Sequence, residues 1–247
     1  MTVRSAHRVA LVTGGSRGIG AAVARRLAED GINVAFTYRA AEASAKAVVA
    51  DIEAYGRRGL SISADSADPA AVVGAVERTV AEFGRLDILV NNAGVFAGGP
   101  IESVSFEDLD RAVAVNVRGV YLVTQAAVRH MGAGGRIVNI GSSFASRVAA
   151  PGVSAYAMTK SAVNGLTRAL ARELGPRGIT VNLILPGSTD TDMNPADSAA
   201  ADAQRTQIAL GRYGSPADVA ATVSHLVGDG GQHISGASIA VDGGATA

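Results

Sequence analysis

Tyr156 and Lys160 are the two residues of this 247-residue sequence whose types and spacing point most directly to chemistry. Residues four apart lie on the same face of a helix, so a helix here brings the Lys160 ammonium close to the Tyr156 phenol. A phenol ordinarily titrates near about 10, and a nearby positive charge lowers that pKa by favouring the phenolate. The pair could therefore exchange a proton, as the reduction of a carbonyl requires. Taken alone, the same spacing is also typical of a helix surface.

Lysine is rare in this sequence, which makes its placement informative. Lys46 and Lys160 are the only lysines among the 22 basic residues, and the rest are arginines. An ammonium group is compact and can release a proton, whereas a guanidinium is planar and stays protonated. A chain that uses arginine for most of its positive charges therefore has a specific need for lysine at position 160.

A glycine-rich turn spans residues 13–20, with the spacing Gly14-x3-Gly18-x-Gly20, between an apolar run and a helical pattern. Glycines allow a sharp turn and a close approach of the backbone to a pyrophosphate, and a helix N-terminus offers it free N–H groups. The spacing differs from the G-x-G-x-x-G fingerprint of dinucleotide-binding folds. The turn predicts a dinucleotide site, with an ordinary strand-to-helix connection as the alternative.

Two arginines near this turn indicate which dinucleotide it would bind. The second expected strand ends at Tyr38 and is followed by Arg39, where a carboxylate would be needed to hold the ribose 2′-hydroxyl of NAD. The next acidic residue is Glu42. Arg39 lies 19 residues after Gly20, and Arg17 lies within the turn. Guanidinium groups suit a 2′-phosphate, which they can bind through two hydrogen bonds. These residues favour NADP(H), although either arginine alone could be a solvated surface residue.

Short β-branched runs alternate with longer helical patterns along the chain. Strands are expected at residues 8–13, 32–38, 59–63, 86–91, 135–140, 179–185 and 237–241. Helices are expected between them, at residues 19–30, 41–55, 69–83, 106–131, 155–174 and 216–227. Strands as apolar as residues 87–90 are covered on both faces, as in parallel sheets. The alternation predicts an α/β fold with a doubly wound, Rossmann-type parallel sheet of about seven strands in three α/β/α layers.

We expect one domain over residues 1–247, because no linker or repeat divides the chain. Residues 188–214 interrupt the regular pattern, since they are polar and rich in alanine. They follow the end of a strand, which is where ligands bind in such sheets. This segment is predicted to be a substrate lid, with a surface loop as the alternative.

The order of four motifs resembles the short, one-domain branch of the short-chain dehydrogenase/reductase family. The motifs are the glycine turn at 13–20, Asn91-Asn92-Ala93-Gly94 after the fourth expected strand, Tyr156-x3-Lys160, and Pro186-Gly187 at the end of a later strand. The resemblance runs from about residue 8 to residue 244. Residues 210–220 look most like those of 3-oxoacyl-carrier-protein reductases and related ketoreductases. Each motif is common by itself, whereas the ordered set is specific.

The resemblance implies a role for each residue of the site. Tyr156 would be the acid/base, Lys160 would also hold the nicotinamide ribose, and Ser143, 13 residues before the tyrosine, would hold the carbonyl oxygen. Asn116 would anchor a water that relays protons to Lys160. Asp65 and Ser66 would contact the adenine, and residues 92–94 would form the wall beside a ribose. The residues that would contact the NADP(H) cofactor are Gly14, Ser16, Arg17, Gly18, Ile19, Gly20, Tyr38, Arg39, Asp65, Ser66, Asn92, Ala93, Gly94, Tyr156, Lys160, Pro186, Gly187, Thr189 and Thr191.

Composition argues against several other classes of protein. The 22 basic and 22 acidic residues leave no net charge that would attract nucleic acid or an acidic membrane. The chain has no cysteine and only four scattered histidines, so we expect neither disulfides nor a metal site. No apolar stretch reaches 18 residues, and a cytoplasmic protein is expected. The helices expected at 106–131 and 155–174 are apolar or small around most of their circumference, which favours a homo-oligomer, by resemblance a tetramer.

The function expected from these residues is the NADPH-dependent reduction of a ketone, such as a 3-oxoacyl compound, to a secondary alcohol. The oxidation of an alcohol with NAD(P) is the alternative within the same class. A non-catalytic NADP(H)-binding protein would keep the glycine turn and break the catalytic set, which is complete here. A nucleotide-sugar epimerase usually carries a longer C-terminal substrate domain, and a hydrolase would need the G-x-S-x-G motif that residues 141–143 lack.

Overall fold

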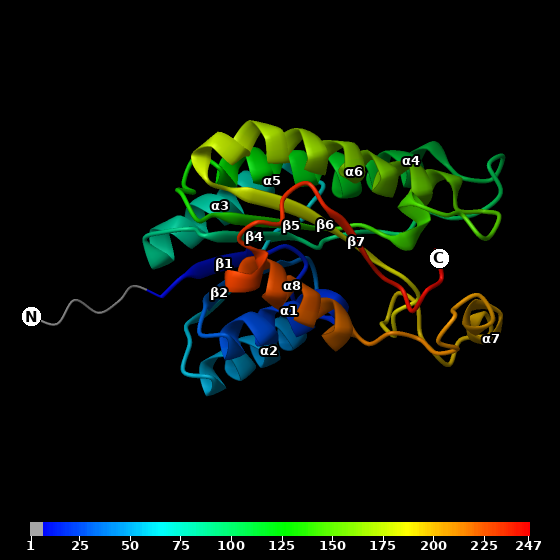
Figure 1. The fold of residues 1–247 in the computed structure, drawn as a ribbon, viewed down its shortest axis with the longest axis horizontal. Coiled ribbons are helices and arrows are strands. Elements are labelled where there is room, and N and C mark those ends of the chain that lie inside the picture. Colours follow the sequence, from blue (N-terminus) through cyan, green and yellow to red (C-terminus); the bar gives the residue numbers. More distant parts are fainter. Residues whose placement is uncertain (1–6) are drawn as a thin grey trace, which may run out of the picture.

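A central parallel sheet organises residues 7–247, the part of the chain that the computed structural model describes (Figure 1). The strands are β1 (Val9–Val12), β2 (Asn33–Tyr38), β3 (Gly59–Ser63), β4 (Ile88–Asn91), β5 (Arg136–Ile140), β6 (Thr180–Pro186) and β7 (Ser238–Val241). All seven are parallel, in the order β3-β2-β1-β4-β5-β6-β7. The predicted doubly wound fold is confirmed, and its strand order reverses between β1 and β4.

Helices cover both faces of the sheet, as Figure 1 shows. One layer contains α1 (Gly18–Glu29), α2 (Glu42–Ala54) and α8 (Pro216–Val227), and the other contains α3 (Pro69–Phe83), α4 (Phe106–Val113), α5 (Val120–Ala127) and α6 (Ser154–Leu174). Each layer has its own apolar core, with Phe36 and Ile52 fully buried in the first and Leu89 and Ile137 in the second. Burial on both faces explains why the central strands are apolar throughout. In residues 7–247, no helix combines the length and apolar character needed to cross a bilayer.

Local sequence signals set the ends of several helices. The Asp68 side chain accepts hydrogen bonds from the first turn of α3, Pro69 occupies the first helical position, and Gly84 ends the helix with a left-handed φ of 77°. At the start of α8, Ser215 and Asp218 form a capping box in which each side chain bonds the backbone of the other. These caps explain why the predicted bounds of both helices agree with the structure.

The long helix expected at residues 106–131 is interrupted in the structure. A six-residue π-helix, η1 (Ala114–Gly119), separates α4 from α5, and α5 already ends at Ala127. Asn116 lies buried within η1 and exchanges two 2.9 Å hydrogen bonds with the backbone of Val95, and it donates a third to the Thr159 hydroxyl at 3.0 Å. The side chain thus ties η1 to the loop after β4 and to α6. Single π-helical turns are often found near functional sites.

Four buried polar side chains fix the helices of the second layer to the strand ends. Asn91 of β4 donates to Asn139 of β5 at 2.8 Å and to Thr124 of α5 at 3.0 Å. Asn139 in turn donates to Thr167 of α6 at 2.9 Å. Because buried polar groups are costly without partners, this chain favours one register of α5 and α6 on the sheet.

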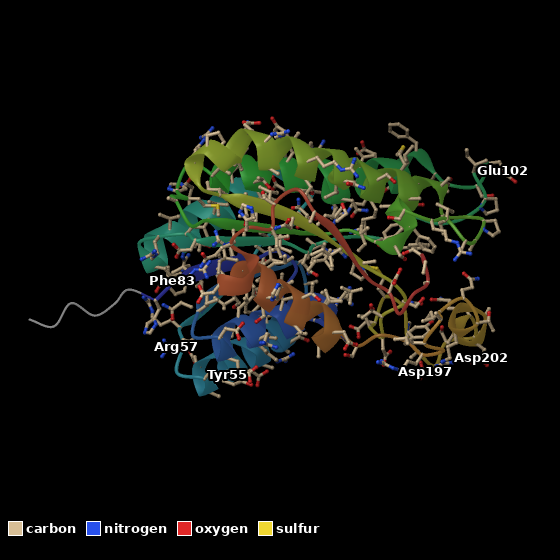
Figure 2. All side chains as sticks on the ribbon, in the orientation of Figure 1. Tyr55, Arg57, Phe83, Glu102, Asp197 and Asp202 are labelled. Atoms are coloured by element: carbon tan, nitrogen blue, oxygen red, sulfur yellow. The ribbon has the colours of Figure 1, made fainter. Side chains whose placement is uncertain are left out.

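Residues 188–214, the predicted lid, extend from β6 past the carboxyl end of the sheet (Figure 1). They contain a short helix, α7 (Ala201–Arg205), that the sequence analysis did not predict, and a small cluster of Ala201, Ile208 and Tyr213 supports it. Figure 2 shows Asp197 and Asp202 of this segment at one end of the molecule, with Tyr55 at the other.

Candidate active site

A cleft of about 750 Å³ lies at the carboxyl ends of the strands. It spans the β1–β4 boundary, where strand order reverses and where doubly wound sheets bind their ligands. The structure brings to this cleft every residue predicted to contact the cofactor, together with Ser143. Asn116 does not line it, although Asn116 is bonded to Val95, which does.

The glycine turn after β1 is packed too closely to carry side chains at its key positions. Gly14 and Gly18 have φ values of 67° and 52°, in the left-handed region that glycine adopts without strain. A Cβ on Gly20 would lie 2.2 Å from the Gly14 carbonyl oxygen and 2.4 Å from Nδ2 of Asn92. The Thr37 hydroxyl accepts the Gly14 N–H at 3.0 Å and holds the turn against β2. This packing leaves the N-terminus of α1 at the cleft, where its free N–H groups can bind a phosphate.

Asn92 joins the same turn to the loop after β4. Its Nδ2 donates to the carbonyls of Thr13 and Gly14 at 2.9 and 3.0 Å. The Thr13 hydroxyl accepts the N–H groups of Asn92 and Ala93, both at 3.0 Å. These four bonds shape the wall of the cleft that is predicted to face a ribose.

The end of the cleft predicted to hold the adenine lies beyond β2 and β3. Tyr38, Arg39, Asp65 and Ser66 line it, and the Arg39 side chain is exposed. Arg111 of α4 also lies here and pairs with Asp65. The sequence analysis missed Arg111, because a contact across 46 positions leaves no local pattern.

Arg17 contacts the predicted lid. Its Nη1 lies 3.4 Å from Oδ2 of Asp192, and both side chains are about two-thirds exposed. Exposed ion pairs contribute about 0–1 kcal/mol. Arg17 can therefore exchange Asp192 for another anion at little cost.

Tyr156 lies near the N-terminus of α6, and the Ser142 side chain lies close enough to its hydroxyl to affect its pKa. Burial raises the pKa of Tyr156 above its ordinary value of 10.0, and the hydrogen bond from Ser142 opposes that shift. This direction is opposite to the one expected from the spacing with Lys160. The Lys160 Nζ lies 5.7 Å from the centre of the Tyr156 ring and donates at 3.1 Å to the carbonyl of Ile140. The phenol is therefore protonated at neutral pH.

Ser142, the residue before the predicted Ser143, is the serine that acts on the Tyr156 phenol. Ser142 is buried shortly after the end of β5, whereas Ser143 is half-buried and begins a short 3₁₀ turn, η2 (Ser143–Ala145). Both serines line the cleft. The role of Ser143, 13 residues before the tyrosine, stays a prediction, and Ser142 is a second candidate for the same role. The serine pair itself, directly after an apolar strand, was the only signal in the sequence.

Lys160 is buried, with 5% of its surface exposed, and burial lowers its pKa to about 8. A Cβ on Gly94 would lie 3.3 Å from the Lys160 Nζ and 3.5 Å from Oδ1 of Asn116, so both polar atoms converge where this glycine has no side chain. The side-chain N–H groups of Asn116 donate to the Val95 carbonyl and to the Thr159 hydroxyl. The predicted water relay through Asn116 therefore stays a prediction, and the hydrogen bonds give this residue a structural role.

The comparison with known proteins agrees with this geometry. Residues 14–246 match a family model described as enoyl-(acyl carrier protein) reductase. A short-chain dehydrogenase from Burkholderia cenocepacia J2315, solved in complex with NADP, is 57% identical and superimposes with a TM-score of 0.96 over 97% of this chain and 98% of that one. The chain belongs to the short-chain dehydrogenase/reductase family.

Other relatives of this chain have names that describe different functions. The 3-oxoacyl-(acyl-carrier-protein) reductase of Staphylococcus aureus (strain Mu50) is 42% identical over 238 residues, which cover 95% of this chain and 96% of the relative. The cyclic-di-GMP-binding biofilm dispersal mediator protein of Escherichia coli (strain K12) is 41% identical over 236 residues, 96% of each chain. Similarity at this level therefore shows the family and leaves the substrate open.

Proposed function

We propose that this protein is an oxidoreductase that uses NADPH to reduce a ketone to a secondary alcohol. The observation that carries the proposal is the convergence of the Tyr156–Ser142 pair and the buried Lys160 on the cleft that also contains the glycine turn. A bound NADPH would supply the hydride, and the protein would supply the proton. The NADP complex of the Burkholderia cenocepacia relative supports the choice of cofactor.

The residues around the cleft fit such a cofactor. The glycine turn and the N-terminus of α1 would hold the pyrophosphate, since a side chain on Gly20 would collide with the turn itself. Arg39 would bind the 2′-phosphate from its exposed position after β2, and Arg17 would join it by leaving Asp192. Pro186 and Gly187 would face the nicotinamide at the end of β6.

Tyr156 would be the proton donor to the carbonyl oxygen. Its raised pKa keeps the phenol protonated at neutral pH. The Ser142 hydroxyl, hydrogen-bonded to that phenol, can bond the same carbonyl oxygen and stabilise the negative charge that develops on it. With a pKa of about 8, Lys160 is a stronger acid than Tyr156. The return of a proton from Lys160 towards Tyr156 is therefore downhill.

The raised pKa of Tyr156 makes the oxidation of an alcohol dependent on pH. Oxidation of an alcohol needs Tyr156 as a phenolate base, and burial disfavours the phenolate. The oxidative direction would gain only as the pH rises towards the pKa of the phenol. Alcohol oxidation with NAD(P) thus remains the alternative, at alkaline pH.

Residues 188–214 are proposed as the lid over the substrate. Met193, Asn194, Ala203 and Ile208 of this segment line the cleft. The contact between Arg17 and Asp192 is the direct link from this segment to the glycine turn. A lid in this position would cover the reacting carbonyl and exclude water from it.

A homo-oligomer, with the tetramer as the specific prediction, is proposed from the outer surface of the second helix layer. Phe106 on α4, Tyr121 on α5 and Met158 on α6 are 83%, 51% and 52% exposed. Small residues Ser161 and Gly165 continue the exposed face of α6. Sedimentation of the purified protein, compared with Tyr121→Glu, would test the assembly, and a cytoplasmic location stays a prediction from the sequence.

The proposed reaction can be tested by following cofactor absorbance. Purified protein and NADPH are incubated with simple ketones, a 3-oxoacyl thioester and an enoyl thioester. Consumption of NADPH with a ketone or the 3-oxoacyl thioester supports the proposal, and no consumption, or consumption with the enoyl thioester alone, contradicts it. Tyr156→Phe should bind NADPH as the wild type does and lose roughly 10²–10⁴-fold in turnover, the usual contribution of general acid catalysis. A protein that only binds the cofactor would show neither effect.

A further inference from the structure

Phe96, in the loop between β4 and α4, lies beside the proposed proton donor. Its ring centre is 5.1 Å from that of Tyr156, with a tilt of 53°. Phe144 lies edge-on to the Tyr156 ring, at 6.3 Å and 88°. Burial of a phenylalanine side chain is strongly favourable, yet Phe96 is 51% exposed. Phe96 also lines the cleft. An aromatic face is therefore available next to the point where the carbonyl would be protonated.

The loop is built to hold this ring in place. A Cβ on Gly98 would lie 2.3 Å from Cε1 and 2.5 Å from Cζ of Phe96, so the ring packs directly on a backbone without a side chain. The Gly99 N–H donates to the Gly152 carbonyl at 2.7 Å, which fastens the loop to the segment that leads into α6 and Tyr156. Figure 2 shows Glu102, farther along the same loop, at the end of the molecule where Asp202 of the predicted lid also lies.

Apolar side chains form much of the lining of the cleft. Aliphatic side chains of the cleft include Val95, Ala149, Ala150, Val153, Met193 and Ile208, beside polar side chains such as Asn194 and Gln207. Of the charged side chains nearby, Arg147 donates to the Ala245 carbonyl, and Asp192 is about two-thirds exposed to solvent. The surroundings of Tyr156 thus suit an uncharged, flat group better than a carboxylate or a phosphate.

We propose that the substrate is an aryl ketone, and that Phe96 is the residue that selects its aromatic ring. The proposal rests on the ketone reduction proposed above. A carbonyl oxygen bonded to Tyr156 leaves the substituents of the carbonyl within reach of the rings that flank this tyrosine. Aromatic pairs with centres about 4.5–7 Å apart are favoured beyond the area that they bury, which corresponds to a preference of roughly two- to tenfold over a saturated ring of the same size.

Two ketones of equal skeleton test this selection. Acetophenone and cyclohexyl methyl ketone differ only in the saturation of the ring, and the ratio of their kcat/KM values is measured with NADPH for each variant. Because intrinsic reactivity cancels between variants, the change in this ratio reports the contribution of Phe96. Phe96→Leu should lower the ratio roughly two- to tenfold, and Phe96→Tyr, which keeps a ring, should retain it.

Tyr55→Leu is the control for the loss of an aromatic ring, since Tyr55 is half-exposed at the end of α2 and does not line the cleft. It should leave the ratio unchanged. Melting temperatures and NADPH binding establish that each variant is folded. An unchanged ratio in a folded Phe96→Leu that reduces both ketones would overturn the role of Phe96 and leave ketone reduction standing. Failure of the wild-type protein to reduce any ketone would instead refute the proposed function and, with it, this inference.

Discussion

The Arg111 guanidinium holds the Asp65 carboxylate through two parallel hydrogen bonds of 2.9 Å. This arrangement lowers the pKa of Asp65 below its ordinary value, chiefly through these bonds. It also connects α4 to the loop after β3, at the end of the cleft predicted to hold the adenine. The acidic side chain that would face the adenine is therefore fixed in one orientation by a helix from the other side of the cleft.

Arg111→Met should weaken NADPH binding through the adenosine half alone. The ion pair is about one-third exposed, so the KM for NADPH should rise roughly three- to tenfold. Reduced nicotinamide mononucleotide lacks the adenosine, and its kcat/KM should stay unchanged. Arg25→Met, which breaks a 2.7 Å pair with Asp51 outside the cleft, is the control for loss of an ion pair. Equal losses with both cofactors would show that Arg111 acts only on folding.

Arg39→Ala should distinguish the two dinucleotides. A hydrogen bond to a charged group contributes roughly 1.5–3 kcal/mol, so the affinity for NADPH should fall about ten- to a hundredfold. NADH has no 2′-phosphate, and its affinity should barely change. Fluorescence titration with both cofactors measures the difference. A parallel loss of NADH binding would contradict the assignment of Arg39 to the phosphate.

The two serines after β5 should differ sharply in effect. Ser142→Ala removes the hydroxyl bonded to Tyr156 and should cost roughly 10²–10³-fold in kcat, as the loss of one oxyanion donor does. Ser143→Ala is expected to stay within about threefold of the wild type. Steady-state kinetics with one ketone and saturating NADPH gives the comparison. The reverse order of effects would restore Ser143, the residue expected from the sequence.

Deprotonation of Lys160 should lower the rate of reduction at alkaline pH and so produce the alkaline limb of the pH–rate profile. The ammonium is present below a pKa of about 8 and is lost above it, so turnover should fall as the pH rises through about 8. Lys160→Arg keeps a charge that does not titrate, and it should be slow and lack this limb. Lys46→Arg is the control, because Lys46 is exposed and pairs with Glu42 at 2.8 Å on α2. Identical profiles for all three proteins would exclude Lys160 from the proton relay.

The buried lysine should also affect stability, with the opposite dependence on pH. Its pKa is about 8 in the folded state and near 10.5 in the unfolded chain, so the cost of burying the charge is fully present below pH 8. Raising the pH towards 10 removes that cost, and the stability of the wild type relative to Lys160→Met should increase by about 2–3 kcal/mol. Urea unfolding of both proteins at pH 7 and pH 10 measures this change. A difference that is independent of pH would refute a buried, titrating lysine.

The sequence predicted the strands and most helices because their signals are local. Asp68 and Gly84 mark the ends of α3, and the apolar runs of β4 and β5 show that both sheet faces are covered. The short helix α7 was missed because it is polar and alanine-rich, and its support from Ile208 and Tyr213 is tertiary. The interruption of the helix at 106–131 was missed because an apolar periodicity does not report the register of backbone hydrogen bonds.

The sequence also predicted part of the candidate site and missed features that depend on tertiary contacts. Residue types and motif order placed Tyr156, Lys160 and the glycine turn at one cleft, which the structure describes. The choice between Ser142 and Ser143 depends on the path of a loop, which spacing alone does not determine. The direction of the Tyr156 pKa depends on burial, and the expectation from helical spacing took account only of charge. Arg111 required a contact between distant parts of the chain.

The π-helix η1 can be understood as a one-residue insertion into a continuous helix. Each α-helical residue turns the chain by about 100°, so one additional residue changes the angular phase between α4 and α5 by that amount. The register of α5 is fixed by the bond between Thr124 and Asn91. Deleting a single residue from η1 would therefore restore an unbroken helix and rotate α4 about its own axis. Arg111 would then point away from Asp65. The adenine end of the cleft would lose this ion pair while the sheet remained intact.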